Sequence, residues 1–310
     1  MGDELPRLLA DQDDVASWAQ LIETGLAAPD VDRMLRRRQL VRVHRRVYVA
    51  HTGPLTPRQR SWAAVLYAAP AALCGPSALA DPEPDRPVHV AIDASRRLAG
   101  TPGVRLHRRR RFDELVQANA TPPRLRYDVL VLDRVAAAPT ELDVVRAIAD
   151  AVGSRRTTAA RLRSELADRS RMPRRRWVGA VLDDVATGAC SVLEHGYLTR
   201  VERAHGLPTA NRQVVRAGSR GREYRDAEYD LGLCVELDGR SAHDSFEAGQ
   251  RDAGRDLDDE AEGRQVLRLR WSQVFGTPCR TASRVGRTLQ RLGWTGSPRP
   301  CGPGCGIVER

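Results

Sequence analysis

The stretch LGLCVELDG, residues 231–239, constrains the fold of this chain more than any other. Its apolar side chains alone would predict a buried β-strand, yet Glu236 and Asp238 lie two positions apart within it. Burying one ionised carboxylate costs free energy, and placing two like charges side by side costs more. We therefore expect this strand to end where a cation neutralises its acids.

The preceding segment, REYRDAEYD at 222–230, predicts a second strand and adds further acids. Strand side chains alternate between faces, so Asp226 and Glu228 share one face, as do Glu236 and Asp238. If the two strands pair, Asp226 and Glu236 can converge. Carboxylate oxygens are hard ligands that suit Mg²⁺ or Mn²⁺, so we expect a divalent ion here.

The surrounding pattern predicts an α/β/α core over residues 188–295. An amphipathic helix is expected first, at 189–207, and it carries Glu194 near its start. The strands are expected at 211–218, 222–230, 231–238 and 264–271. A charged helix at 245–263 and a final helix at 279–294 complete the order helix, three strands, helix, strand, helix.

Residues 189–295 resemble the PD-(D/E)xK nuclease superfamily, and within it the group similar to very-short-patch-repair endonucleases. The matching pieces are Glu194, RDAEYD with Asp226, CVELDG with Glu236 and Asp238, His243, RDAGRD at 251–256 and QVLRLRW. The resemblance implies a restriction-endonuclease-like core that hydrolyses DNA phosphodiesters with a divalent metal. It implies that Asp226 and Glu236 hold the metal, and that Asp238 is a further ligand or positions the attacking water.

The sequence departs from the superfamily at its third motif, Glu-x-Lys, where Glu236-Leu237-Asp238 stands instead and the whole chain contains no lysine. We expect His243 to transfer the proton, because its ordinary pKa of about 6.5 suits that task. Arg255 is expected to stabilise the developing phosphate charge, and Glu194 to orient a water. Alternatively, arginines or backbone N–H groups satisfy the acids, so whether the chain is an enzyme stays open.

Residues 1–55 predict a winged helix-turn-helix that binds DNA. Helices are expected at 14–25 and 28–39, followed by a basic hairpin in LVRVHRRVYVAH at 40–51. The expected DNA-binding residues are Arg36, Arg37, Arg38, Arg42, Arg45 and Arg46. A winged helix used only for protein contact is the alternative.

Residues 56–187 predict a mixed α/β region. Two helices are expected within 56–80, strands at 86–93 and 103–110, and helices at 141–152, 157–171 and 174–188. Residues 10–180 resemble AbiE-type antitoxin proteins of type IV toxin–antitoxin systems, on LVRVHRRVYVA and RQRSWAAVLYAAPAALCGPSAL. The resemblance implies a winged-helix start joined to a mixed α/β region, and it leaves open whether a cognate toxin exists.

The formal net charge of +10 favours a polyanionic partner such as DNA, although a solvated basic surface explains it equally well. Apolar runs are too short to span a bilayer and the acidic N-terminus lacks a signal-peptide pattern, so we expect a cytoplasmic protein without membrane contact. No glycine-rich nucleotide loop is present, and we expect no small-molecule cofactor.

Residues 296–310 form a tail rich in glycine, proline and cysteine, in which PCGPGC places Cys301 and Cys305 four positions apart. Together with Cys279 these thiols would need a fourth ligand to hold zinc. No CxxC…CxxC pattern supplies one, so we do not expect structural zinc.

These patterns together predict an α/β protein that is a metal-dependent DNA endonuclease targeted by its winged helix. The alternative is a DNA-binding regulator or antitoxin whose nuclease fold is degenerate. The sequence leaves open the substrate, the recognition sequence and the oligomeric state.

Overall fold

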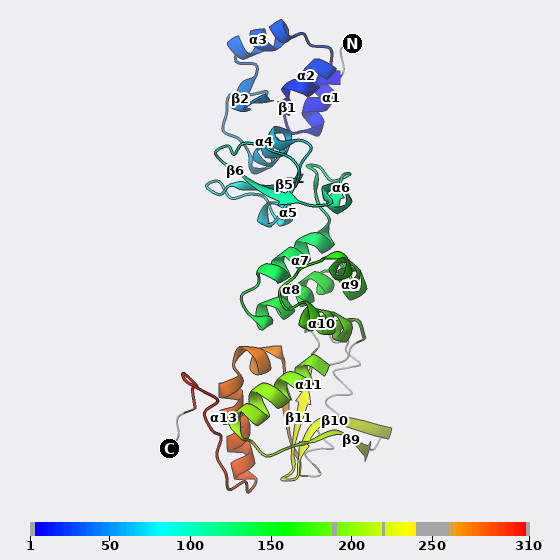
Figure 1. Cartoon of the computed structure of the whole chain (residues 1–310), viewed down its shortest axis with the longest axis vertical. Helices are drawn as coiled ribbons and strands as arrows, with labels where there is room; N and C mark the ends of the chain where they lie inside the picture. The colour runs from blue at the N-terminus through cyan, green and yellow to red at the C-terminus, as the bar shows by residue number, and fades with distance from the viewer. Residues whose placement is uncertain (1–3, 188–190, 219–220, 240–260, 262, 308–310) are drawn as a thin grey trace. The chain divides into compact units, whose positions relative to one another are not determined.

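The computed structural model describes residues 4–187, 191–218, 221–239, 261 and 263–307 of the chain. It divides into two compact units, Met1–Arg134 and Val135–Arg310. Both units combine helices with β-sheets, so the predicted mixed α/β class is confirmed (Figure 1). Within the described ranges, none of the helices is long and apolar enough to cross a membrane.

The first unit begins with helices and a small antiparallel sheet in the order β1-β3-β2. The elements are α1 (Glu4–Asp11), β1 (Val15–Ser17), α2 (Trp18–Glu23), α3 (Ala28–Arg36), β2 (Val41–His44) and β3 (Val47–Val49). Ser17 and Gln20 form a capping box that fixes the start of α2. Leu21, Val31 and Leu40 are fully or almost fully buried and pack into one apolar cluster around α2 and α3.

Two helix predictions in this region need correction. The helix predicted at 14–25 begins only at Trp18, because Val15 and Ser17 pair with β3 as a strand. The helix predicted at 28–39 ends at Arg36, because Arg38 has a φ of 58°, which takes the backbone out of the right-handed helix.

The rest of the first unit contains a five-stranded sheet in the order β6-β5-β4-β8-β7. Its strands are β4 (Ala72–Leu73), β5 (Val88–Asp93), β6 (Val104–Arg109), β7 (Val116–Gln117) and β8 (Arg124–Leu125). Its helices are α4 (Pro57–Ala68), α5 (Pro76–Leu79) and α6 (Phe112–Leu115), and α7 (Tyr127–Ala137) spans the boundary between the two units. The strands predicted at 86–93 and 103–110 are confirmed as β5 and β6. The second helix predicted within 56–80 shrinks to α5, because Ala72 and Leu73 pair with β5 instead.

The second unit starts with helices and continues into a four-stranded sheet in the order β12-β11-β10-β9, in which only β11 and β12 run parallel. Its strands are β9 (Asn211–Gly218), β10 (Gly221–Tyr229), β11 (Leu233–Leu237) and β12 (Gln265–Leu269). Its α-helices are α8 (Glu141–Gly153), α9 (Ala159–Asp168), α10 (Arg175–Thr187), α11 (Ser191–Tyr197) and α13 (Pro278–Arg291). Two π-helical turns, η1 (Leu198–Glu202) and η3 (Ser272–Gly276), and a 3₁₀ turn, η2 (Arg203–His205), complete it.

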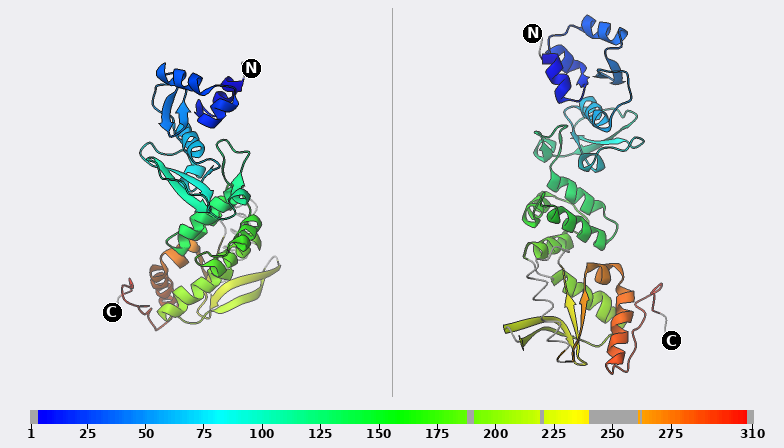
Figure 2. Two further views of the ribbon diagram at one scale, coloured as in Figure 1. Left: turned by 45° about the horizontal axis from the view of Figure 1, so that its top comes forward. Right: turned by 180° about the vertical axis from the view of Figure 1, so that it is seen from behind.

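The core of the second unit lies between the sheet and the helices α11 and α13 (Figures 1 and 2). Tyr197 of α11 and Val285 of α13 are fully buried against Val235 of β11. The Tyr197 and Tyr229 hydroxyls hydrogen-bond at 2.8 Å, and burial raises the pKa of both phenols. This packing fixes β10 and β11 relative to the helices.

The four strands and the final helix predicted for this unit are confirmed to within three residues at each end. The helix predicted at 189–207 is α11 followed by the π and 3₁₀ turns. The charged helix predicted at 245–263 lies almost wholly outside the described residues, so the second helical layer of the α/β/α core stays a prediction.

Candidate functional site

Strands β10 and β11 bring two of the predicted acids together. They pair antiparallel with Ala227 opposite Val235 and Tyr229 opposite Leu233. One step further in the same register places Asp226 opposite Glu236. The backbone N–H of Leu237 donates to Asp226 Oδ2 at 2.7 Å, which fixes that carboxylate against β11. The strand pairing on which the predicted convergence depended is therefore present.

The electrostatics at Asp226 are unfavourable for an isolated carboxylate. Burial raises the pKa of Asp226, and the neighbouring Glu236 carboxylate raises it further, against the lowering effect of the Leu237 N–H. A raised pKa means that the ionised form is costly in this position. A cation beside Asp226 would remove that cost.

Arginines already occupy both oxygens of Glu236. Arg225 Nη1 donates to Oε1 at 2.6 Å, and Arg268 Nε donates to Oε2 at 3.2 Å. The Arg225 side chain is only 3% exposed, so this ion pair is largely shielded from water. Arg268 reaches Glu236 because the two residues are direct neighbours across the parallel β11–β12 pair.

Asp238 follows the end of β11 and is held in a similar way. Arg270 Nη2 donates to Asp238 Oδ2 at 3.2 Å, and the Asp238 backbone N–H donates to Leu269 O at 2.9 Å. All three predicted carboxylate ligands thus accept hydrogen bonds from the protein itself. A metal ion at this site would compete with arginines for Glu236 and Asp238, and, among the described residues, only with a backbone N–H for Asp226.

Of the three remaining predicted site residues, the structure describes only Glu194. Glu194 lies in the first turn of α11 and is half-buried. His243 and Arg255 lie outside the described residues. The chemistry assigned to these three residues stays a prediction.

The six arginines predicted to bind DNA are all exposed. Arg36 ends α3, Arg37 and Arg38 follow it, Arg42 lies in β2, and Arg45 and Arg46 form the turn before β3. The Arg46 guanidinium lies 5.1 Å from the centre of the Trp18 ring, and the Trp18 N–H donates to Arg46 O at 2.8 Å. This cation–π contact holds the turn against the start of α2.

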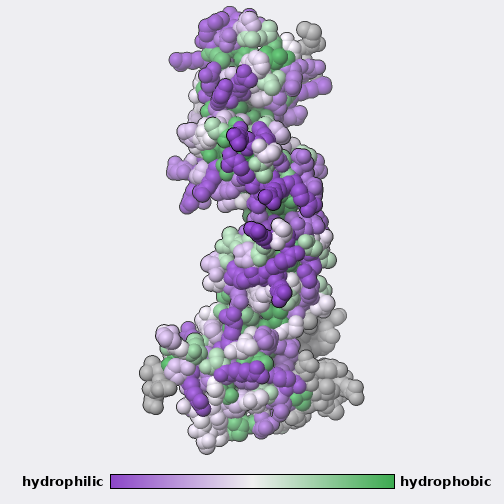
Figure 3. Space-filling model, viewed as in Figure 1, coloured by the Kyte–Doolittle hydropathy of each residue, from purple (hydrophilic) through white to green (hydrophobic). Residues whose placement is uncertain are grey.

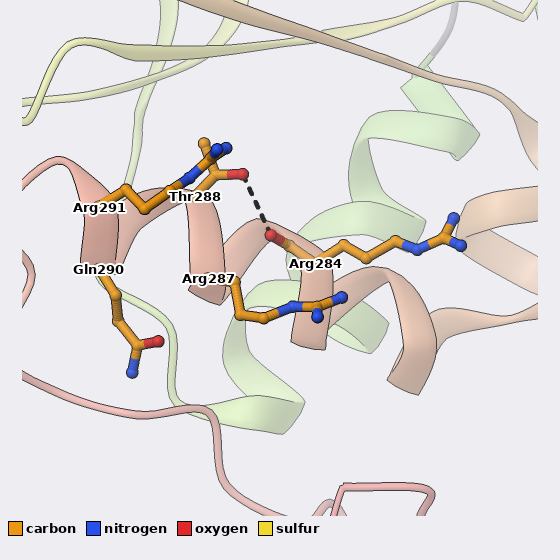
Figure 4. A pocket seen from close by; sticks show the side chains of 5 residues that line it. All are labelled: Arg284, Arg287, Thr288, Gln290 and Arg291. Atoms are coloured by element: carbon orange, nitrogen blue, oxygen red, sulfur yellow. Dashed lines mark hydrogen bonds between the residues drawn. The ribbon is translucent and has the colours of Figure 1, made fainter.

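A second group of exposed arginines, which the sequence analysis did not single out, follows one face of α13. Arg280, Arg284, Arg287 and Arg291 recur at spacings of three and four, the period of a helical face. Arg284, Arg287 and Arg291 line an open hollow of about 660 Å³ together with Thr288 and Gln290 (Figure 4). Hydrophilic residues cover much of the molecular face shown in Figure 3.

His205 is a further partner of the cysteines near the chain end that was not predicted from the sequence. His205, Cys279, Cys301 and Cys305 place their potential ligand atoms within 4.8 Å of one another. Among the described residues this is the one such group of three or more, and it does not include Asp226, Glu236 or Asp238. A histidine that ends a 3₁₀ turn 100 positions before Cys305 gives no local signal in the sequence.

Comparison with known proteins adds no constraint, since neither a family model nor a curated protein matches this chain. The case for a function therefore depends on the geometry and charge of these sites.

Proposed function

We propose that residues 188–295, within the second unit, form a metal-dependent nuclease domain that hydrolyses DNA phosphodiesters, and that residues 1–55 target it to DNA. One observation carries the proposal: Asp226 lies across from Glu236 on paired strands, with a raised pKa. Two carboxylates at adjacent positions repel each other, and a bound cation would offset that repulsion.

The carboxylate oxygens of Asp226, Glu236 and Asp238 match the ligand preference of Mg²⁺ or Mn²⁺. When bound, such an ion would act as a Lewis acid toward the phosphodiester. The protein's own part is orientation: the Leu237 N–H holds Oδ2 of Asp226, and no other described residue hydrogen-bonds that carboxylate. Arg225 and Arg268 fix the position of Glu236 in the same way.

The arrangement of the first fifty residues supports a winged helix. Three helices and a three-stranded sheet follow one another in the order α1, β1, α2, α3, β2, β3. In such a fold α3 enters the major groove and the β2–β3 turn forms the wing. The exposed Arg36, Arg42 and Arg45 then lie on elements that face the duplex.

The exposed arginines of α13 give the nuclease domain its own means of binding the phosphate backbone. Arg284, Arg287 and Arg291 are exposed, and no described residue forms an ion pair with them. The planar guanidinium group suits phosphate. We expect DNA binding to weaken with salt, by about one unit of log–log slope for each phosphate contact removed.

A second function, a DNA-binding regulator or antitoxin with a degenerate nuclease fold, has a specific observation in its favour. Arginines occupy both oxygens of Glu236, and the chain has no lysine for the third superfamily motif. In that case the acids and arginines form a structural network and no metal enters.

Single-turnover cleavage of plasmid DNA with Mn²⁺ separates the two functions. The nuclease proposal expects cleavage by the wild type and its loss in Asp226→Asn, with unchanged DNA affinity. Asp230→Asn is the matched control, because Asp230 is an exposed acid just beyond β10 that hydrogen-bonds Asn211 and is not part of the site.

His243→Ala is expected to slow the chemical step by ~10²–10⁴-fold, as for loss of a general acid–base group. A wild type that binds DNA and Mn²⁺ but cuts no DNA would instead establish the binding function.

A further inference from the structure

Four side chains near the C-terminal end of the second unit converge in the manner of metal ligands. Cys279 lies in the first turn of α13, His205 ends the 3₁₀ turn η2, and Cys301 and Cys305 lie in the tail. The Cys279 and Cys301 sulfurs are 3.7 Å apart, and Cys305 Sγ is 3.8 Å from His205 Nε2. With Zn–S bonds of about 2.3 Å, tetrahedral ligation places two sulfurs roughly 3.7–3.8 Å apart.

We propose that His205, Cys279, Cys301 and Cys305 bind a structural zinc ion that fastens the C-terminal tail to the second unit. Three thiolates and one imidazole are one of the standard donor sets of structural zinc sites. The three-residue spacer between Cys301 and Cys305 falls within the usual two to four. The sequence-based expectation of no structural zinc assumed that no fourth ligand was available, and His205 supplies it.

The environment of His205 is that of an oriented ligand. Its ring is fully buried, and Nδ1 lies 3.1 Å from the carbonyl oxygen of Val201. Donation from Nδ1 to that carbonyl leaves the Nε2 lone pair directed at the cysteines. Metal-binding histidines are commonly held in this way by a carbonyl or carboxylate on the other nitrogen.

The backbone of the tail is shaped to present its two cysteines. Gly304 has a φ of 78°, and the Cys305 N–H donates to Gly302 O at 3.2 Å, which closes a tight turn between the cysteines. With this turn closed, the Cys301 and Cys305 sulfurs both lie within 4.8 Å of the Cys279 sulfur and of a ring nitrogen of His205.

Contacts on both sides of the cluster show what the ion would hold in place. The Arg299 N–H donates to His205 O at 2.8 Å, and Ile307 packs against the apolar core of the unit. A Cβ added at Gly286 would lie 2.3 Å from Pro298 Cγ, so the tail crosses α13 in close contact (Figure 1). The zinc would join this crossing to η2 and to the start of α13.

Metal analysis of the full-length protein tests the proposal without any activity assay. Purified protein dialysed against metal-free buffer should retain about one zinc per chain, as expected of a high-affinity structural site. Cys301→Ser should lose most of it. Cys301 is exposed, so its substitution leaves the core intact, and Cys74→Ala, in the first unit, is the control that should keep zinc.

Replacement of zinc by Co²⁺ gives a second readout that reports ligand type. The wild type should show the visible absorption of tetrahedral cobalt and the sulfur-to-cobalt charge-transfer band, and Cys301→Ser should not. The proposal is overturned if the wild type holds no zinc and no cobalt, or if Cys301→Ser binds both as the wild type does. Isolation of a Cys279–Cys301 disulfide from metal-free native protein would also overturn it.

Discussion

The acidic site on β10 and β11 and the thiol cluster beside α13 belong to the same compact unit, yet their charged or ionisable groups have different partners. At the acidic site, Glu236 and Asp238 accept hydrogen bonds from arginines that neighbouring strands supply. At the thiol cluster, the side-chain partners of the cysteines are one another and His205. A metal must therefore compete for the oxygen ligands, whereas the sulfur ligands already converge on one point.

Residue type alone therefore does not identify a metal site. The acids have the ligand chemistry, but guanidinium groups can satisfy them at the cost of metal affinity. Guanidinium groups do not satisfy thiols in the same way, so a group of three cysteines and a histidine within 4.8 Å has few explanations besides a metal. We expect the two sites to differ in affinity, exchange rate and effect on stability.

The largest effect on stability is expected from removing the proposed zinc ion. A chelator that strips zinc should lower the stability of the second unit by about 4 kcal/mol, the linkage term for a ligand present at a thousand times its dissociation constant. Scanning calorimetry with and without the chelator measures this loss. Cys301→Ser should start at the lower melting temperature and respond little to the chelator. An equal response in both proteins would mean that zinc acts elsewhere.

The next largest effect is expected from Glu236→Gln in metal-free protein. The substitution leaves the buried Arg225 guanidinium without its carboxylate, a loss of about 1–3 kcal/mol. Urea denaturation should show a lower midpoint with an unchanged slope. A variant as stable as the wild type would show that the arginines do not depend on Glu236, and the contrast between the two sites would weaken.

Asp226→Asn should instead stabilise the metal-free protein, with a gain in unfolding free energy of about 0.2–1 kcal/mol at neutral pH, the range for a cross-strand pair. Asparagine can still accept from the Leu237 N–H, and it removes the repulsion from Glu236. Because the folded-state pKa of Asp226 is raised, the cost of ionising it appears as pH rises above the ordinary value of 3.8.

The gain in Asp226→Asn should therefore be complete above the raised pKa and should vanish as pH falls toward 3.8. Melting temperatures of both proteins between pH 4 and pH 8 test this. A difference that does not change with pH would assign the gain to packing instead of charge.

The smallest effect on stability is expected from Arg268→Ala. Its side chain is 36% exposed, and partly exposed ion pairs contribute about 0–1 kcal/mol. The same change frees Glu236 Oε2, so Mn²⁺ should bind several-fold more tightly, as for removal of a competing cation at a surface site. Arg280→Ala, on the exposed face of α13, is the control. Unchanged Mn²⁺ affinity in Arg268→Ala would show that arginine and metal do not compete.

The apolar and alternating patterns along the sequence predicted the strands whose formation depends on neighbouring residues in the chain. The apolar run around Cys234 predicted β11, and the alternation around Asp226 predicted β10. The acids on both strands predicted that the two strands lie side by side, as they do. Short elements formed by distant pairing were missed, such as β1, which is a strand only because β3 lies beside it.

The sites also combine features that local sequence predicts with features that depend on distant residues. The oxygens of Glu236 are bonded by Arg268, 32 positions away, because β12 pairs in parallel with β11. His205 lies beside Cys305, which is 100 positions further along the chain, and beside Cys279 and Cys301. Both features depend on tertiary packing, and no spacing in the sequence encodes them.

Measuring both metals in one sample tests the central claim, that this unit has two separate metal sites of different chemistry. Wild type, Asp226→Asn and Cys301→Ser would be equilibrated with Mn²⁺, and bound Mn²⁺ and zinc determined for each. We predict that Asp226→Asn loses Mn²⁺ and keeps zinc, and that Cys301→Ser loses zinc and keeps Mn²⁺. Loss of both metals in either variant, or Mn²⁺ binding that depends on Cys301 and not on Asp226, would contradict the account.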